Sequence, residues 1–194
     1  MKKKKHNRKF LNTFFSERKQ VGAVAPSSRF LVKKMCAKID FKLADVILEL
    51  GPGTGVFTTE LLKRAKPDTK IILLELNEAF YELLVKKFED PRLLILNRSA
   101  DEMGEILDDY HIKEVDAILS SLPLTIIPER IKKKIVIQSY NRLKEGGVFT
   151  QYQYSLSAKR LLESKFGSIK INFVPANIPP AFIYSAKKEK SIAV

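Results

Sequence analysis

The chain has 194 residues, which is enough for one well-buried core and too short for two ordinary domains with separate cores. Its 35 Lys and Arg residues outnumber its 22 Asp and Glu residues, and the net charge of +13 favours a polyanionic partner, either nucleic acid or an anionic membrane. A single cysteine excludes an intramolecular disulfide and a Cys-rich metal site, so we expect a cytoplasmic protein without a metal.

Residues 1–20 are the first predicted element, a basic amphipathic helix ahead of one catalytic domain over residues 21–194. Phe10, Leu11, Phe14 and Phe15 fall on one side of this helix at about 100° per residue. Such a face can lie in a lipid interface, or it can pack on the domain or cover a cofactor. No run approaches the roughly 20 apolar residues of a membrane-spanning helix, so we expect a peripheral protein on the inner face of the membrane.

From Asp45 onward, strand-like apolar runs alternate with amphipathic helical stretches, which predicts an α/β fold with helices on both faces of a Rossmann-like, mostly parallel sheet. Only a few residues separate the last two strands, so we expect a C-terminal antiparallel hairpin. The seven predicted strands are Val46–Leu50, Lys70–Leu76, Leu93–Arg98, Val115–Ser120, Val148–Tyr154, Lys170–Val174 and Ala181–Ser185. The predicted helices are Phe57–Ala65, Glu78–Phe88, Met103–Tyr110, Pro128–Leu143 and Ser157–Phe166.

Three glycines in alternate positions, Gly51, Gly53 and Gly55, follow the first predicted strand and open the next helix. Glycine lets the backbone turn sharply and approach a ligand closely, and the helix start offers free N–H groups. The spacing does not match the dinucleotide fingerprint, and the Gly-Lys-Ser/Thr ending of a P-loop is missing. The pattern therefore predicts a nucleotide-type pocket of another kind.

Acidic side chains stand at the ends of three successive predicted strands: Glu49, Glu75 and Asp101. A carboxylate about twenty residues beyond the glycines, as at Glu75, can accept both hydroxyls of a ribose. Any one of these acids alone could be a solvated loop residue or a helix cap. Three acidic residues at corresponding positions of successive strands favour a ligand site over a set of solvated or capping residues.

The string from Glu49 to Gly55 resembles motif I of the class I methyltransferases. The resemblance implies S-adenosylmethionine as cofactor, S-adenosylhomocysteine as product, and a place for Asp101 beside the adenine amino group. We also expect Ser28, Leu76 and Ser120 in the cofactor-binding set.

The fourth predicted strand ends in Ser120-Ser121-Leu122-Pro123-Leu124, where amino-methylating enzymes of this class hold the target nitrogen. In the related base-methylating motif an aromatic residue stacks on the flipped base, and here that position is Leu124. Together with the strings from Val21 to Ser28 and from Asn177 to Ala181, the motif resembles the bacterial phospholipid N-methyltransferases. That family methylates phosphatidylethanolamine toward phosphatidylcholine.

The resemblance implies an anionic membrane surface and a phospholipid amine as partners, and we expect a monomer. We predict Ser121 and Leu122 as catalytic residues, with Tyr152 and Tyr184 as aromatic faces for a methylated ammonium. Strand packing is the alternative explanation for each tyrosine.

Two alternatives to the lipid substrate stay open. An enzyme similar to the rRNA adenine dimethyltransferases would share the glycines, the acids and the basic charge, although it would normally carry an extra helical C-terminal domain for RNA. The other alternative is a non-catalytic protein that only binds S-adenosylmethionine.

Overall fold

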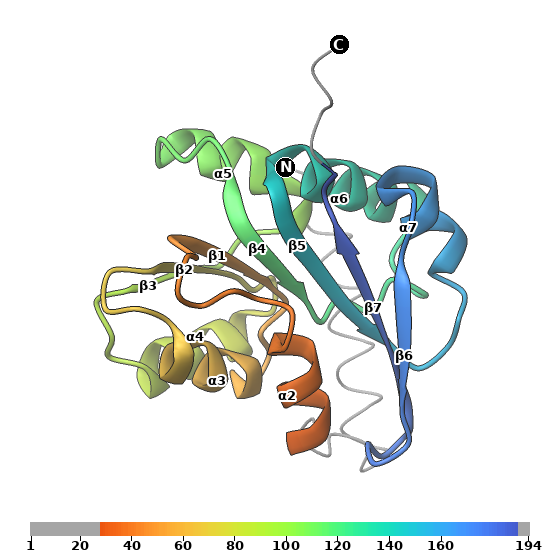
Figure 1. Cartoon of the computed structure of the whole chain (residues 1–194). Coiled ribbons are helices and arrows are strands. Elements are labelled where there is room, and N and C mark those ends of the chain that lie inside the picture. Colours follow the sequence, from red (N-terminus) through yellow and green to blue (C-terminus); the bar gives the residue numbers. More distant parts are fainter. Residues whose placement is uncertain (1–27, 190–194) are drawn as a thin grey trace.

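A computed structural model of the chain describes residues 28–189, which form one seven-stranded sheet in the order β3-β2-β1-β4-β5-β7-β6 (Figure 1). Strands β1 to β5 are parallel to one another, and β7 is antiparallel to both β5 and β6. The strands are β1 (Val46–Leu50), β2 (Lys70–Leu74), β3 (Leu93–Leu96), β4 (Val115–Ser120), β5 (Leu143–Gln153), β6 (Lys170–Val174) and β7 (Ala181–Lys187).

Helices cover both faces of this sheet (Figure 1). On one face lie α2 (Arg29–Cys36), α3 (Val56–Arg64) and α4 (Glu78–Lys87), and on the other lie α5 (Met103–Asp109), α6 (Glu129–Arg142) and α7 (Lys159–Phe166). A short 3-10 helix, η1 (Ala100–Glu102), precedes α5. No helix within residues 28–189 is both long enough and apolar enough to cross a bilayer.

The side chains of the central strands pack alternately into two separate hydrophobic cores, because successive residues of a strand point to opposite faces of the sheet. In β1, Ile47 joins Leu31 and Phe57 in the core under α2 and α3. Its neighbour Leu48 joins Met103 in the core under the other helix layer. Burial on both faces explains why the strand sequences read as continuous apolar runs.

The seven strands and the antiparallel hairpin that the sequence predicts are confirmed. The bounds differ most at β5, which begins at Leu143 rather than Val148, because Val115 pairs with Leu143 while Ala117 pairs with Val148. The residues between those pairs form an irregularity in which Gly146 adopts a φ of +77°. From the sequence alone, Gly146 and Gly147 indicate a turn before the strand.

The sequence analysis also missed α2, whose buried side is formed by Leu31, Val32, Met35 and Cys36. Ser28 caps this helix by accepting a hydrogen bond from the Leu31 N–H at 3.2 Å. The helix predicted over residues 1–20 lies outside the described residues.

Candidate functional site

The loop between β1 and α3 takes its shape from the three glycines, which have φ values of +69°, +57° and +75°. A Cβ at Gly51 would lie 2.9 Å from Leu122 Cδ2, and one at Gly55 would lie 2.5 Å from Phe88 Cε2. At Gly53, by contrast, a Cβ would meet nothing within 4 Å. The outer two glycines thus allow tight packing, while Gly53 exposes backbone that a ligand can approach closely.

Glu75 follows β2, and the residue is only 2% exposed. It accepts hydrogen bonds from the Gly53 N–H at 3.0 Å and from the Asn77 N–H at 2.8 Å, which ties the glycine loop to the end of β2. Burial raises the pKa of Glu75 to about 6, although these amide donors act in the opposite direction. The side chain is therefore a carboxylate at neutral pH, with acceptor capacity left for further donors.

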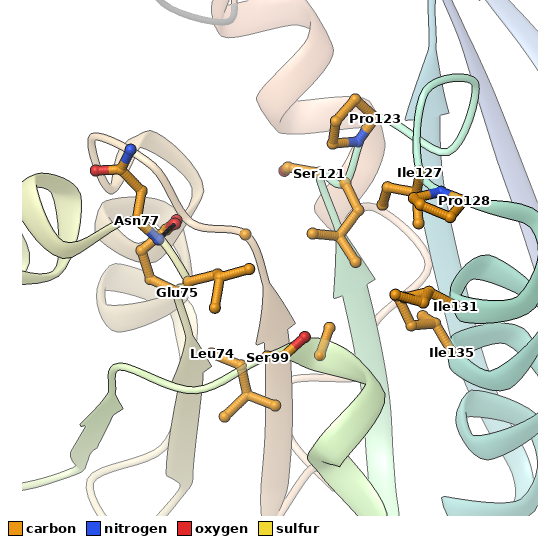
Figure 2. A pocket seen from close by; sticks show the side chains of 14 residues that line it. Leu74, Glu75, Asn77, Ser99, Ser121, Pro123, Ile127, Pro128, Ile131 and Ile135 are labelled. Atoms are coloured by element: carbon orange, nitrogen blue, oxygen red, sulfur yellow. Dashed lines mark hydrogen bonds between the residues drawn. The ribbon is translucent and has the colours of Figure 1, made fainter. Parts of the chain in front are cut away.

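A pocket opens beside this carboxylate. Figure 2 shows Glu75 and Asn77 on one side of it, Ser121 and Pro123 on the other, and side chains of α6 and the preceding loop along a third wall. Those on the third wall are Ile127, Pro128, Ile131 and Ile135.

The lining fits the adenosyl part of S-adenosylmethionine. Apolar walls suit a purine ring, and the Glu75 carboxylate can accept from the ribose hydroxyls. Leu76, predicted as a cofactor residue, lies in this lining next to Glu75. Gly51 lies there too, and the open side of Gly53 leaves room for the rest of the molecule.

Glu49, which the sequence predicts in the cofactor-binding set, is not among the residues that line this pocket. It is fully buried at the end of β1, where one carboxylate oxygen accepts a hydrogen bond from Thr58 Oγ1 at 2.7 Å and the other has no partner. Burial raises the pKa of Glu49 to about 8. Its contact with Thr58 fastens α3 to β1, so Glu49 supports the glycine loop from below.

Asp101 also lies outside the pocket lining. Its carboxylate accepts from Ser99 Oγ and lies 3.5 Å from Lys134 Nζ. The residues that do line the pocket after β3 are Ser99 and Ala100. Sequence reasoning missed these two because it looked for an acidic side chain; their position directly after β3 was the available signal.

Ser28 and Ser120 occupy structural positions rather than the pocket wall. The Ser28 N–H donates to Asn177 Oδ1 at 2.9 Å. The string that ends at Ser28 and the string that begins at Asn177 therefore meet, although 149 positions separate the two residues. Ser120 is 1% exposed, and its hydroxyl accepts from the Leu122 N–H at 3.5 Å.

Ser121 and Leu122, predicted as catalytic, both line the pocket where the chain leaves β4. The Ser121 N–H donates to the Leu50 carbonyl at 2.9 Å, so this segment lies against the end of β1. Ser121 Oγ is buried without a hydrogen-bond partner.

The structure does not bring the two predicted tyrosines into the pocket. Tyr184 is fully buried in the core under α7, and its hydroxyl donates to the Ser155 carbonyl at 2.8 Å. Burial raises the pKa of Tyr184 to about 12, which rules it out as a phenolate base at neutral pH. Tyr152 lies on the other face of the sheet, with its ring 5.8 Å from that of Phe57 at the start of α3.

Within residues 28–189, no group of three or more His, Cys, Asp or Glu side chains is placed to hold a metal ion.

A parallel sheet closed by an antiparallel strand, with a glycine loop after β1 and a carboxylate at the tip of β2, defines a class I methyltransferase that uses S-adenosylmethionine. The family model for ribosomal RNA adenine dimethylases matches residues 15–165. The chain belongs to that family, and it is an S-adenosylmethionine-dependent methyltransferase.

The relatives of this chain differ in how much of it they match. An ornithine lipid N-methyltransferase of Singulisphaera acidiphila is 28% identical over 93% of this chain and 95% of its own length. A ribosomal RNA small subunit methyltransferase A of Mycoplasma capricolum is 29% identical, but over 55% of this chain and 40% of its own length. The chain thus matches less than half of that second protein.

Solved structures agree on the fold. A precorrin-6y C5,15-methyltransferase from Geobacter metallireducens superposes with a TM-score of 0.67 at 19% identity, covering 84% of this chain and 89% of its own. A 16S rRNA guanine methyltransferase from Thermus thermophilus, solved with AdoMet and guanosine, gives a TM-score of 0.62 and covers 81% of this chain.

Proposed function

We propose that this methyltransferase transfers methyl groups to the primary amine of a membrane-lipid headgroup, working at the membrane surface. The observation that carries the proposal is the burial of Leu124. This residue holds the place where base-methylating relatives have a stacking aromatic side chain, and it is 2% exposed in the core under α6. Within residues 28–189, none of the side chains that line the pocket is aromatic.

Positioning is the main task of the residues around the acceptor amine. Bound S-adenosylmethionine supplies an electrophilic methyl group that the amine lone pair attacks in line. The segment Ser121–Pro123 forms the pocket wall facing Glu75, where it can hold the nitrogen in that line. The apolar walls keep water out and lower the pKa of the acceptor ammonium, which favours its neutral, nucleophilic form.

The pattern of similarity supports a lipid acceptor. The ornithine lipid enzyme matches this chain nearly from end to end. Ornithine lipid and phosphatidylethanolamine both present a primary amine at a membrane surface, so one positioning mechanism serves either headgroup. Phosphatidylethanolamine remains our first candidate.

Exposed apolar side chains at the carboxyl edge of the sheet also support a membrane surface. Phe30 near the start of α2 is 63% exposed, and Ile178 in the β6–β7 connection is 80% exposed. They belong to neighbouring segments, because Ser28 is hydrogen-bonded to Asn177. Arg29 and Lys33 add exposed positive charge to α2, as an anionic leaflet would favour.

Methylation of an adenine in ribosomal RNA is the second candidate, favoured by the family to which the chain belongs and by its net charge of +13. A single experiment separates the candidates. Purified full-length chain is incubated with radiolabelled S-adenosylmethionine and either vesicles containing phosphatidylethanolamine, vesicles containing ornithine lipid, or unmodified ribosomal RNA. Label in either lipid is the expected result, and label in RNA alone, or in neither class, would refute the proposal.

A further inference from the structure

The carbonyl oxygen of Leu122, in the pocket wall, accepts two hydrogen bonds from side chains of β5. Gln151 Nε2 donates at 2.9 Å and Gln153 Nε2 donates at 2.8 Å. Both glutamines are buried, with exposed fractions of 0% and 5%. Buried amides of this kind are costly to desolvate, so their convergence on one loop carbonyl calls for an explanation.

The sheet register brings these amides to the loop. Ser120, the last residue of β4, is paired with Gln151 of β5. Because strand residues alternate between the two faces, Gln151 and Gln153 project from the same face of β5. Both therefore reach the segment that leaves β4, and Gln151 Nε2 also donates to the Tyr152 carbonyl at 2.8 Å.

These two bonds fix the direction of the loop. A carbonyl oxygen has two lone pairs, and the glutamines use both, so the Leu122 carbonyl has no lone pair left for a substrate amine. The neighbouring Ser121 hydroxyl is buried without a partner, and within the described chain it is the one such polar atom that belongs to a residue lining the pocket. Ser121 Oγ is thus an unpaired polar atom directly beside the carbonyl that the glutamines hold.

The loop also touches the cofactor side of the pocket. The Leu122 side chain lies directly over Gly51, where a Cβ would come within 2.9 Å of Leu122 Cδ2. A displacement of the Leu122 carbonyl therefore moves both Ser121 and the contact with the glycine loop. A shift of about 1 Å in a positioning group can slow a reaction by about a hundredfold.

We propose that Gln151 and Gln153 are positioning residues for methyl transfer: by holding the Leu122 carbonyl, they aim Ser121 at the acceptor amine. Methyl transfer is the activity of the enzyme class, so the inference rests on the proposed function only for the identity of that amine.

The isosteric substitution Gln153→Glu tests donation directly. An ionised carboxylate has no hydrogen to donate and repels the Leu122 carbonyl, whereas a protonated carboxyl group can donate again. Burial of this position raises the pKa of the introduced carboxyl group, which brings its titration toward neutral pH. We expect kcat about ten- to a hundredfold below wild type at pH 8, with the ratio of variant to wild type recovering as the pH is lowered.

Gln138→Glu is the matched control. Gln138 of α6 uses its Oε1 to accept from the Gly104 N–H at 3.1 Å, a role that a glutamate oxygen can keep. Its kcat should equal that of wild type at each pH. Thermal melting and calorimetric titration with S-adenosylhomocysteine are measured for both variants at each pH, and kcat is compared under conditions in which each variant is folded and saturated with cofactor, which separates positioning from loss of fold.

The truncation Gln153→Ala provides a second readout, because it removes one donor without adding charge. We expect a smaller loss of kcat that does not recover at low pH. All rates are measured on whichever acceptor the wild-type enzyme labels, so that a wrong lipid assignment does not decide the outcome. A pH-independent ratio for Gln153→Glu, or a drop in melting temperature at unchanged kcat, would overturn the inference.

Discussion

Glu49 and Glu75 end neighbouring strands of the sheet and have the same chemistry in different surroundings. Glu75 receives two backbone N–H donors at the pocket, and burial raises its pKa to about 6. Glu49 receives one hydroxyl donor beneath the glycine loop, and burial raises its pKa further, to about 8. The amide donors keep Glu75 ionised at neutral pH, which suits a group that accepts hydrogen bonds from a ribose.

The raised pKa of Glu75 predicts a pH dependence of cofactor binding. Ribose hydroxyls donate to the carboxylate, so affinity for S-adenosylhomocysteine should fall as the pH falls through about 6, by about tenfold at pH 5. Glu75→Gln should bind more weakly and without this pH dependence. Isothermal titration between pH 5 and pH 8 measures both, and a flat wild-type profile would contradict the assignment.

Stability should respond to Glu75 in the opposite sense. The pKa of its folded state lies above the unfolded value of 4.5, so the folded state binds more protons between pH 4.5 and about 6. Its contribution to the free energy of unfolding therefore decreases as the pH rises through that window. Cofactor affinity should therefore fall as the pH is lowered through this window, whereas the contribution of Glu75 to the free energy of unfolding should rise, and this difference in sign separates the two effects.

At the scale of elements, the connection from β1 to α3 combines two kinds of glycine. Gly55 caps α3 in a left-handed conformation against Phe88 and Leu84 of the α4 segment, so its role is packing. Gly53 has a similar φ but faces open space, and its N–H holds Glu75. The same residue type thus fastens a helix at one position and leaves room for a ligand at the other.

Alanine at each position should separate these roles. Gly53→Ala should cost about 1–2 kcal/mol for the left-handed backbone and should abolish most S-adenosylhomocysteine binding. Gly55→Ala should cost clearly more, because the new Cβ also clashes with Phe88 at 2.5 Å. Urea unfolding with calorimetric titration measures the pair, and equal losses of stability would refute the distinction.

At the scale of the whole molecule, the start of α2 and the β6–β7 connection lie together at the carboxyl edge of the sheet (Figure 1). The pocket is lined by residues at the same edge. The exposed side chains of Phe30 and Ile178 lie at this edge. Leu43, 72% exposed, lies in the turn that leads into the opposite end of β1. Exposed apolar side chains thus occur at both edges of the sheet, and substitutions at each edge can test which of them contacts a membrane.

The double substitution Phe30→Ser with Ile178→Ser should lower the partitioning of the full chain onto anionic vesicles by at least about tenfold. Each apolar side chain that leaves water contributes about 1.5–3 kcal/mol, and about 1.4 kcal/mol is a factor of ten. Leu43→Ser is the control and should bind like wild type. Co-sedimentation measures all three proteins, and equal binding by the double variant would exclude this edge as the lipid-facing surface.

The sequence by itself determined the sheet, its hairpin and the glycine loop. Those features follow from local patterns: apolar runs of strand length, a connection too short for a crossover, and glycines where the backbone must turn. Gly51 and Glu75 were expected at the pocket from the glycine spacing and from the ends of parallel strands, which meet at one edge. Leu76, Ser121 and Leu122 were expected there from the resemblance to known methyltransferases, and all five residues line the pocket.

Only the tertiary structure decided which side chains face that pocket. Glu49, Asp101 and Tyr184 carry suitable chemistry, but the pleat of the sheet and the packing of the helices direct them into the interior or toward neighbouring side chains. The bond between Ser28 and Asn177, and the pair of glutamines on the Leu122 carbonyl, join segments that are remote in the chain. Side-chain direction depends on contacts across the fold, which no local pattern in the sequence encodes.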